Sequence, residues 1–219
     1  RIRFIHPDGF QGLQDLQNLD LSINRVHLLS LEKFPQSLTT LNLRSSTYMI
    51  LEPGHGFLTY LKQFDFSNNL GYAFRTDIQS LLCVVTALLA PKLEYLHLNG
   101  NNVVSRSIKI PDCVLDQPNL KVLIGRDNKL TKVFDLSKVP LLERLDLSYN
   151  QIRDVNNSFV NLSSLLHLDL RKGTKSQLQI SRLPDRSISI KCFILYRLSA
   201  FMKVIIFLAT LITLIRYAW

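Results

Sequence analysis

One phrase, written repeatedly along the chain, restricts its fold more than any other feature. Leu142-Glu-Arg-Leu145-Asp-Leu147-Ser-Tyr-Asn150-Gln-Ile152 spaces apolar residues at fixed offsets around a closing Asn. Further copies, some of them imperfect, begin at residues 16, 38, 61, 93, 120 and 165. The alternating apolar residues occupy one side of a short strand, and the residues between them occupy the other side. Such a chain folds as a stack of units, because a single unit cannot bury its own apolar side.

This spacing is that of the leucine-rich repeat, in which each unit has one short strand and a return segment. We therefore predict an α/β fold, a curved leucine-rich repeat solenoid with short parallel strands on its concave face. The repeats occupy 1–180, as about seven units plus part of a preceding one. The closing Asn is expected to bond backbone groups of the turn, and Ser46 replaces it in the second unit.

The unit that begins at residue 61 is 32 residues long and needs a separate explanation. Its additional residues carry an apolar stripe at helical spacing, which predicts a helix over about 77–89 on the convex side. Pro91 follows and would end that helix. The segment is either an insertion that forms a docking feature or simply a longer return.

Charge is distributed unevenly along the chain. The net charge is +9, but residues 171–219 hold nine of the 26 basic residues and one of the 17 acidic residues. The repeats over 1–170 therefore carry 17 basic and 16 acidic residues, a net charge of +1. A nearly neutral body does not indicate nucleic-acid binding.

Catalytic and metal-binding patterns are not found in the sequence. Cys83, Cys113 and Cys192 are odd in number and far apart, and they match neither a zinc site nor a disulfide framework. No nucleophile elbow, phosphate-binding loop or HExxH pattern occurs. We predict a chain that is not an enzyme and that has no cofactor or metal site.

The residues between the strand leucines are the candidates for ligand binding. In the first and third units they are the default Asp and Ser of the repeat, whereas the later units carry aromatic, amide, His and Arg side chains. Such side chains on adjacent strands form either a ligand-binding patch or an ordinary solvated surface. The candidate residues are Tyr95, His97, Asn99, Arg126, Arg144, His167 and Arg171. His97 and His167 are too far apart in repeat order to form a metal pair.

Two glycosylation motifs, Asn156-Asn157-Ser158 and Asn161-Leu162-Ser163, lie between the sixth and seventh strands. Asn156 and Asn161 would be the acceptors if this part of the chain faces a secretory compartment. The motif is short and occurs often by chance.

The C-terminal part of the chain differs from the repeats. A basic linker over 181–197 precedes a hydrophobic segment over 198–219. Twenty-two helical residues span about 33 Å, enough for a hydrocarbon core of about 30 Å. The segment is interpreted as a transmembrane or membrane-anchoring helix. The alternatives are a hydrophobic helix that caps the solenoid and non-native sequence read through from outside the usual exons.

The phrase Phe159-x-x-Leu162-x-x-Leu165-x-x-Leu168-x-Leu170, and its counterpart from Phe10 to Asn24, resemble the ectodomain of a Toll-like receptor. The resemblance covers about 1–180. It implies a fragment of a single-pass receptor of innate immunity at the cell surface or in endosomes, which binds a protein or microbial ligand and dimerises. The chain would be secreted if its tail is not an anchor. The alternative is a leucine-rich repeat scaffold or matrix protein that mediates protein–protein interaction.

Overall fold

The computed structural model describes most of the repeat region. The described residues are 1–6, 8–26, 28–30, 34–46, 50–52, 58–69, 90–101, 115–153, 159, 161–171 and 189–191. The helix predicted over 77–89, the three cysteines, Asn156 and the hydrophobic segment over 198–219 lie outside them. Within the described ranges, no helix is long and apolar enough to cross a bilayer.

Ten strands of three residues each form the regular structure of the described residues, which include no helix. The strands are β1 (Asn18–Asp20), β2 (Leu28–Ser30), β3 (Thr40–Asn42), β4 (Ile50–Glu52), β5 (Gln63–Asp65), β6 (Tyr95–His97), β7 (Val122–Ile124), β8 (Arg144–Asp146), β9 (His167–Asp169) and β10 (Ser189–Lys191).

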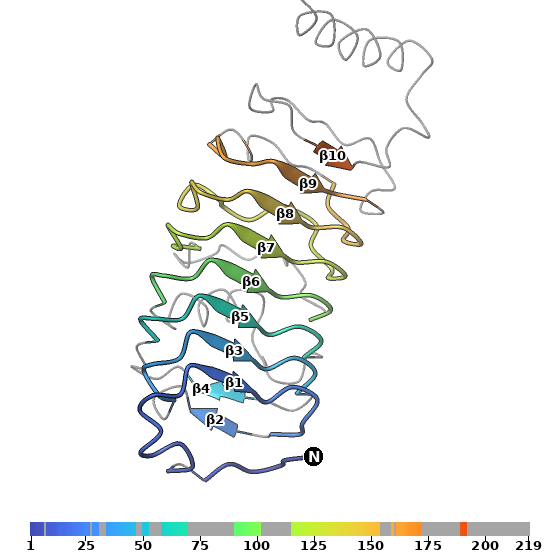
Figure 1. Cartoon of the computed structure of the whole chain (residues 1–219). Helices are drawn as coiled ribbons and strands as arrows, with labels where there is room; N and C mark the ends of the chain where they lie inside the picture. The colour runs from blue at the N-terminus through green and yellow to red at the C-terminus, as the bar shows by residue number, and fades with distance from the viewer. Residues whose placement is uncertain are drawn as a thin grey trace, which may run out of the picture.

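Eight of these strands form one parallel sheet in the order β1-β3-β5-β6-β7-β8-β9-β10. They stack one above another from the N-terminal end, as Figure 1 shows. The register is constant, so the central residue of each strand faces that of its neighbour, as with Leu123 and Leu145. The predicted parallel-strand leucine-rich repeat solenoid is confirmed.

The core follows the leucines of the repeated phrase. The central residues of β3 and of β5 to β9 are at most 1% exposed, and Leu38, Leu61, Leu93, Leu120 and Leu142 are fully buried. Because each leucine packs against the same positions of neighbouring units, burial depends on stacking. Among the described residues, Gly125 stands at the place of a core leucine, and the side chain of Leu147 from the next unit packs against it: a Cβ added to Gly125 would lie 3.1 Å from Leu147 Cδ2.

The closing Asn residues connect neighbouring units in what we call the ladder, composed of Asn24, Ser46, Asn69, Asn101, Asn128 and Asn150. Asn101 is representative. Its Nδ2 donates to the carbonyl oxygens of Phe66 and Leu98 at 2.9 and 3.0 Å, and its Oδ1 accepts from Asn69 N at 2.8 Å. Ser46 keeps one such bond, from its Oγ to Leu21 O. The predicted turn-closing role of these residues is confirmed.

The structure adds two features that the repeat spacing did not predict. β10 pairs in parallel with β9, so an eighth strand lies within the segment interpreted as a linker. β2 and β4 form a separate parallel pair. All three of these strands, β2, β4 and β10, lie in sequence that lacks the repeated phrase.

Candidate ligand-binding site

The side of the main sheet that faces away from the leucines is here called the open face, and it carries three rows of side chains. The first row is the first residue of each strand, the second row is the third residue, and the third row lies two residues further on. Strand pairing places Tyr95, Val122, Arg144 and His167 side by side in the first row. His97, Ile124, Asp146 and Asp169 follow in the second. Asn99, Arg126, Ser148 and Arg171 follow in the third.

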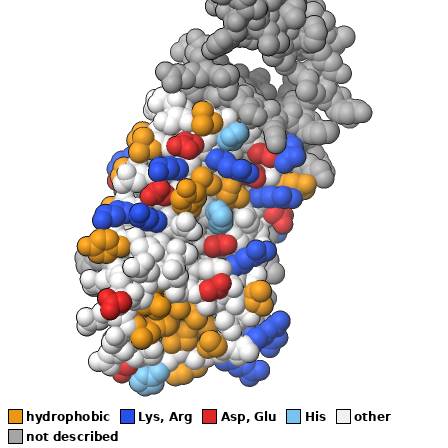
Figure 2. Space-filling model, in the orientation of Figure 1, with side chains coloured by type: hydrophobic (Ala, Val, Ile, Leu, Met, Phe, Trp, Pro, Cys, Tyr) orange, Lys and Arg blue, Asp and Glu red, His pale blue; other side chains and the backbone are white. Residues whose placement is uncertain are grey.

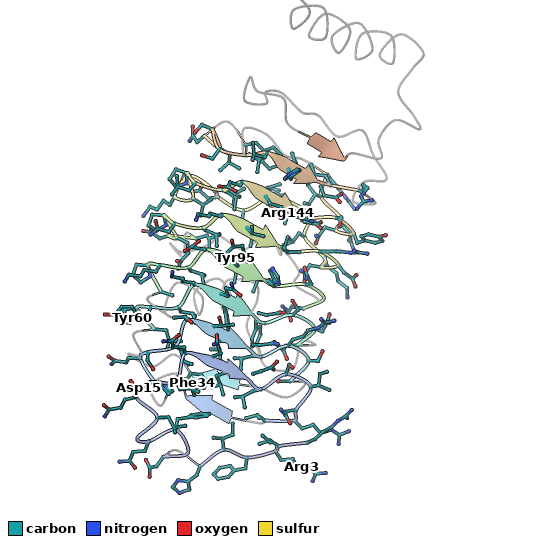
Figure 3. All side chains as sticks on the ribbon, viewed as in Figure 1. Arg3, Asp15, Phe34, Tyr60, Tyr95 and Arg144 are labelled. Atoms are coloured by element: carbon teal, nitrogen blue, oxygen red, sulfur yellow. The ribbon has the colours of Figure 1, made fainter. Side chains whose placement is uncertain are left out.

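All seven residues predicted from the sequence therefore lie on this one face, on β6 to β9. Figure 3 shows Tyr95 and Arg144 on the same side of the sheet, with β7 between their strands. Tyr95 and Arg144 are exposed, and His97 is half-buried. The binding role assigned to these residues remains a prediction.

The N-terminal strands present a different surface. β1, β3 and β5 carry Asn18, Thr40 and Gln63 in the first row and Asp20, Asn42 and Asp65 in the second. The second-row oxygens accept from the backbone N–H two residues later, with distances of 2.8 to 3.1 Å at Ser22, Arg44 and Ser67. These side chains close the strand ends, so their default Asp or Asn is structural.

The middle of the open face is apolar. Val122 and Ile124, the first and third residues of β7, are both apolar. Each of the other described strands has a polar residue in at least one of these two positions. Figure 2 shows hydrophobic side chains over this part of the sheet, with Lys, Arg, Asp and Glu around them. The candidate residues predicted from the sequence did not include Val122 and Ile124. The replacement of the default Asp of the repeat by Ile124 could have indicated this apolar patch.

Several polar residues of the open face are already paired within the protein. Asp65 Oδ2 lies 3.8 Å from His97 Nδ1 across neighbouring strands. Burial alone would raise the pKa of Asp65, but the neighbouring His97 side chain and the hydrogen bonding of Ser67 outweigh it and lower the pKa. At the other end, Arg171 Nε lies 3.0 and 2.9 Å from the two carboxylate oxygens of Asp169, which raises the pKa of Arg171.

The two remaining arginines differ in their surroundings. Arg126 lies over the Tyr149 ring, with 4.3 Å from the guanidinium carbon to the ring centroid. Tyr149 had not been expected to contribute, because sequence spacing does not reveal this contact. Arg144 is exposed, and within the described part of the chain its guanidinium makes no ion pair or side-chain hydrogen bond.

The histidines and acids do not form a metal site in the described part of the chain. His97 is in the second row of β6 and His167 in the first row of β9, with two strands between them. The Asp residues of the second row are interrupted by Asn42, His97 and Ile124, so only Asp146 and Asp169 are neighbours. No group of three His, Cys, Asp or Glu side chains there could hold a metal ion.

Of the two glycosylation motifs, the second lies partly in the described structure. Asn161 and Ser163 are exposed, whereas Leu162 between them is fully buried. Leu162 N donates to Phe159 O at 3.1 Å, which places Asn161 in a turn just before β9. The acceptor side chain is therefore accessible.

Comparison with known proteins places this geometry among leucine-rich repeat proteins. The chain is 30% identical to mouse podocan-like protein 1 over 142 residues, 58% of this chain and 25% of that protein. It is 28% identical to pig Toll-like receptor 9 over 172 residues, 76% of this chain and 13% of that receptor. The chain thus spans a quarter or less of the curated relatives that it matches. No family model matches it.

Solved structures agree on the fold. A leucine-rich repeat protein of Leptospira interrogans superposes with a TM-score of 0.65 at 23% identity, covering 85% of this chain and 45% of that one. A plant peptide hormone receptor superposes with a TM-score of 0.53 at 19% identity, covering 82% of this chain and 36% of that one. At these identities the likeness concerns the fold alone. The described part of the chain is thus a leucine-rich repeat solenoid with homologues that include a Toll-like receptor.

Proposed function

We propose that the chain is a non-catalytic recognition module that binds a protein partner through the open face of β6 to β9. The observation that carries this proposal is the unevenness of the face. β1, β3 and β5 carry Asp, Thr or amide side chains, of which Asp20, Asn42 and Asp65 are bonded to their own turns, whereas β6 to β8 carry Tyr95, Val122, Ile124 and Arg144. Aromatic and Arg side chains dominate binding energy at protein interfaces, since they combine large contact area with directional hydrogen bonds.

The finer proposal is that this module belongs to a Toll-like pattern-recognition receptor, held at a membrane by the segment over 198–219 and paired with a second receptor chain. The match to Toll-like receptor 9 across 76% of the chain supports it. The match to podocan-like protein 1 supports the alternative, a leucine-rich repeat scaffold or matrix protein.

A site-specific photocrosslinker tests the binding face. The chain would be produced in mammalian cells behind a cleavable signal peptide, with benzoylphenylalanine at Tyr95 or, as the matched control, at Tyr60. Tyr60 is 53% exposed but lies at the flank of the sheet, before β5. Discrete adducts from Tyr95 and none from Tyr60 are expected. Adducts from Tyr60 alone, or from neither position, would contradict the proposal.

Glycosylation tests whether the solenoid folds in a secretory compartment. In the same cells, the Asn161→Gln variant is expected to migrate as a lighter species than the parent, because the exposed acceptor is lost. Treatment with an N-glycosidase should remove the difference. A parent that carries no glycan at Asn161 favours an intracellular scaffold over the receptor.

A further inference from the structure

The apolar patch at the middle of the open face is not part of the buried core of the described residues. Val122 and Ile124 are half-buried, and Tyr95 on the adjacent strand is 38% exposed. The core lies on the opposite side of β7, where Leu123 is fully buried. The three side chains therefore leave apolar surface in water, and contact with an apolar group of a partner would remove that surface from water.

A guanidinium group is present directly beside this patch. Arg144 pairs in register with Val122, so the two side chains neighbour each other in the first row. The other arginines of β7 to β9 on this face are engaged, Arg126 over Tyr149 and Arg171 with Asp169. A guanidinium binds a carboxylate through two parallel hydrogen bonds. In doing so Arg144 would break no ion pair or side-chain hydrogen bond of the described residues.

The charges around Arg144 favour one carboxylate over a polyanion. Asp146 and Asp169 lie in the second row, and Asp65 lies at the other side of the patch. Their negative charges would repel the closely spaced phosphates of a nucleic acid. A peptide with a single carboxylate can reach Arg144 while its apolar side chain covers the patch.

Spacing sets the form of such a peptide. Neighbouring strands lie about 4.8 Å apart, and residues on one side of an extended peptide recur about every 6.8 Å. The flexible stem of Arg144 covers the difference. We propose that β6, β7 and β8 bind an extended acidic peptide in which a large apolar residue and an Asp or Glu are two positions apart, the apolar residue on Val122 and Ile124 and the carboxylate on Arg144. This inference rests on the proposed function.

A peptide selection tests it. A phage library of random octapeptides would be panned against the full chain, and the enriched peptides would be synthesised and measured by fluorescence anisotropy. Enriched peptides should carry Leu, Ile, Val or Phe two positions from Asp or Glu. Arg144→Gln should weaken binding by about tenfold or more, because a charge-assisted pair is lost. Replacing the Asp or Glu of the peptide with Asn or Gln should weaken binding to the parent by a similar factor. The same peptide change should not weaken binding to the Arg144→Gln variant any further, because the pair is already lost there.

Arg44→Gln is the matched control. Arg44 is also an exposed open-face arginine without a side-chain partner in the described structure, but its neighbours are Ser22 and Ser67 and no apolar patch adjoins it. Its substitution should change affinity by less than about twofold, as expected for a charge that lies away from the contact. Circular dichroism would verify that both variants keep the parent fold.

Three outcomes would overturn the inference: no enriched peptide, enriched peptides without an acid, or equal binding by the parent and Arg144→Gln. A twelve-nucleotide single-stranded DNA that binds more tightly than the peptides and depends on Arg144 would overturn it as well. Failure of the proposed function can be distinguished from failure of this inference, because the proposed function is tested by the crosslink from Tyr95 to a partner.

Discussion

At the scale of single residues, the backbone just before each ladder residue has a left-handed conformation. Ile23, Ser45, Asn68, Asp127 and Tyr149 have φ between 54° and 59°, and Gly100 has 60° at the equivalent place. The repeat requires this conformation because the strand ends here and the side chain of the next residue, the ladder residue, must point into the protein. The left-handed conformation costs an L-residue about 1–2 kcal/mol, and β-branched residues tolerate it least.

Ile23 is accordingly a site for stabilisation. Its side chain is 61% exposed, so little burial is lost on replacement. We expect Ile23→Asn to raise the free energy of unfolding by about 0.5–1 kcal/mol, because Asn tolerates positive φ and already occupies this place as Asn68. The midpoint of urea unfolding would measure it. Gly100→Ala is the opposing control, since a Cβ there would lie 2.2 Å from Asn68 Oδ1; a lower midpoint for Ile23→Asn would refute the argument.

The ladder itself yields a second prediction. Asn101→Ala removes both donors to the carbonyl groups of Phe66 and Leu98 and the acceptor for Asn69 N. Asn101 is 6% exposed, so water does not readily replace these bonds, and a loss of about 2–4 kcal/mol is expected. Asn119→Ala, which removes one exposed bond to Pro91 O, should cost under about 1 kcal/mol. Similar losses in both variants by urea unfolding would show that the ladder is not what connects the units.

At the scale of elements, each strand has only three residues and depends on its neighbours for burial. Leu145 of β8 is fully buried between the leucines of β7 and β9. Its position in a stack means that truncation opens a cavity which two units share.

Leu145→Ala should therefore lower the free energy of unfolding by about 2–5 kcal/mol. Leu166→Ala, in the residue before β9, removes a side chain that is 52% exposed and should change stability by no more than about 0.5 kcal/mol. Chemical unfolding of both variants provides the comparison, and equal effects would mean that the strand leucines do not form the core.

At the scale of the whole molecule, the carboxylates that close strand ends connect stability to pH. Hydrogen bonds from Ser22 lower the pKa of Asp20, and the neighbouring His97 side chain and Ser67 lower the pKa of Asp65 despite its burial. The folded chain thus binds these protons less readily than the unfolded chain, so stability rises with pH. This contribution is fully present above the unfolded pKa of about 3.9 and is lost as pH falls through the lower folded values.

We expect the urea midpoint to fall as the pH drops below about 4, and to fall less in Asp65→Asn. Asn keeps an oxygen to accept from Ser67 N, as Asn42 does for Arg44 N, but it does not titrate. Glu143→Gln, which removes an exposed carboxyl, should keep the acid sensitivity of the parent. An unchanged pH slope in Asp65→Asn would exclude Asp65 as a source of it.

The sequence by itself determined the parts of this protein that recur. Each copy of the phrase places leucines at the same offsets, and burial of one strand side by stacking follows from that spacing alone. The parallel sheet, its register, the core and the role of Asn101 and Ser46 were therefore predictable. The seven candidate residues also followed, because strand alternation assigns each to the open face.

Only the tertiary structure decided what depends on contacts between units. Arg171 pairs with Asp169, His97 with Asp65 and Arg126 with Tyr149, whereas Arg144 has no side-chain partner among the described residues. No spacing rule predicts which side chains meet. The same holds for β10, whose backbone joins the sheet without the repeated phrase. Periodicity specifies which side of a strand is buried, whereas the partners of each exposed side chain depend on rotamers and on neighbours that are distant in sequence.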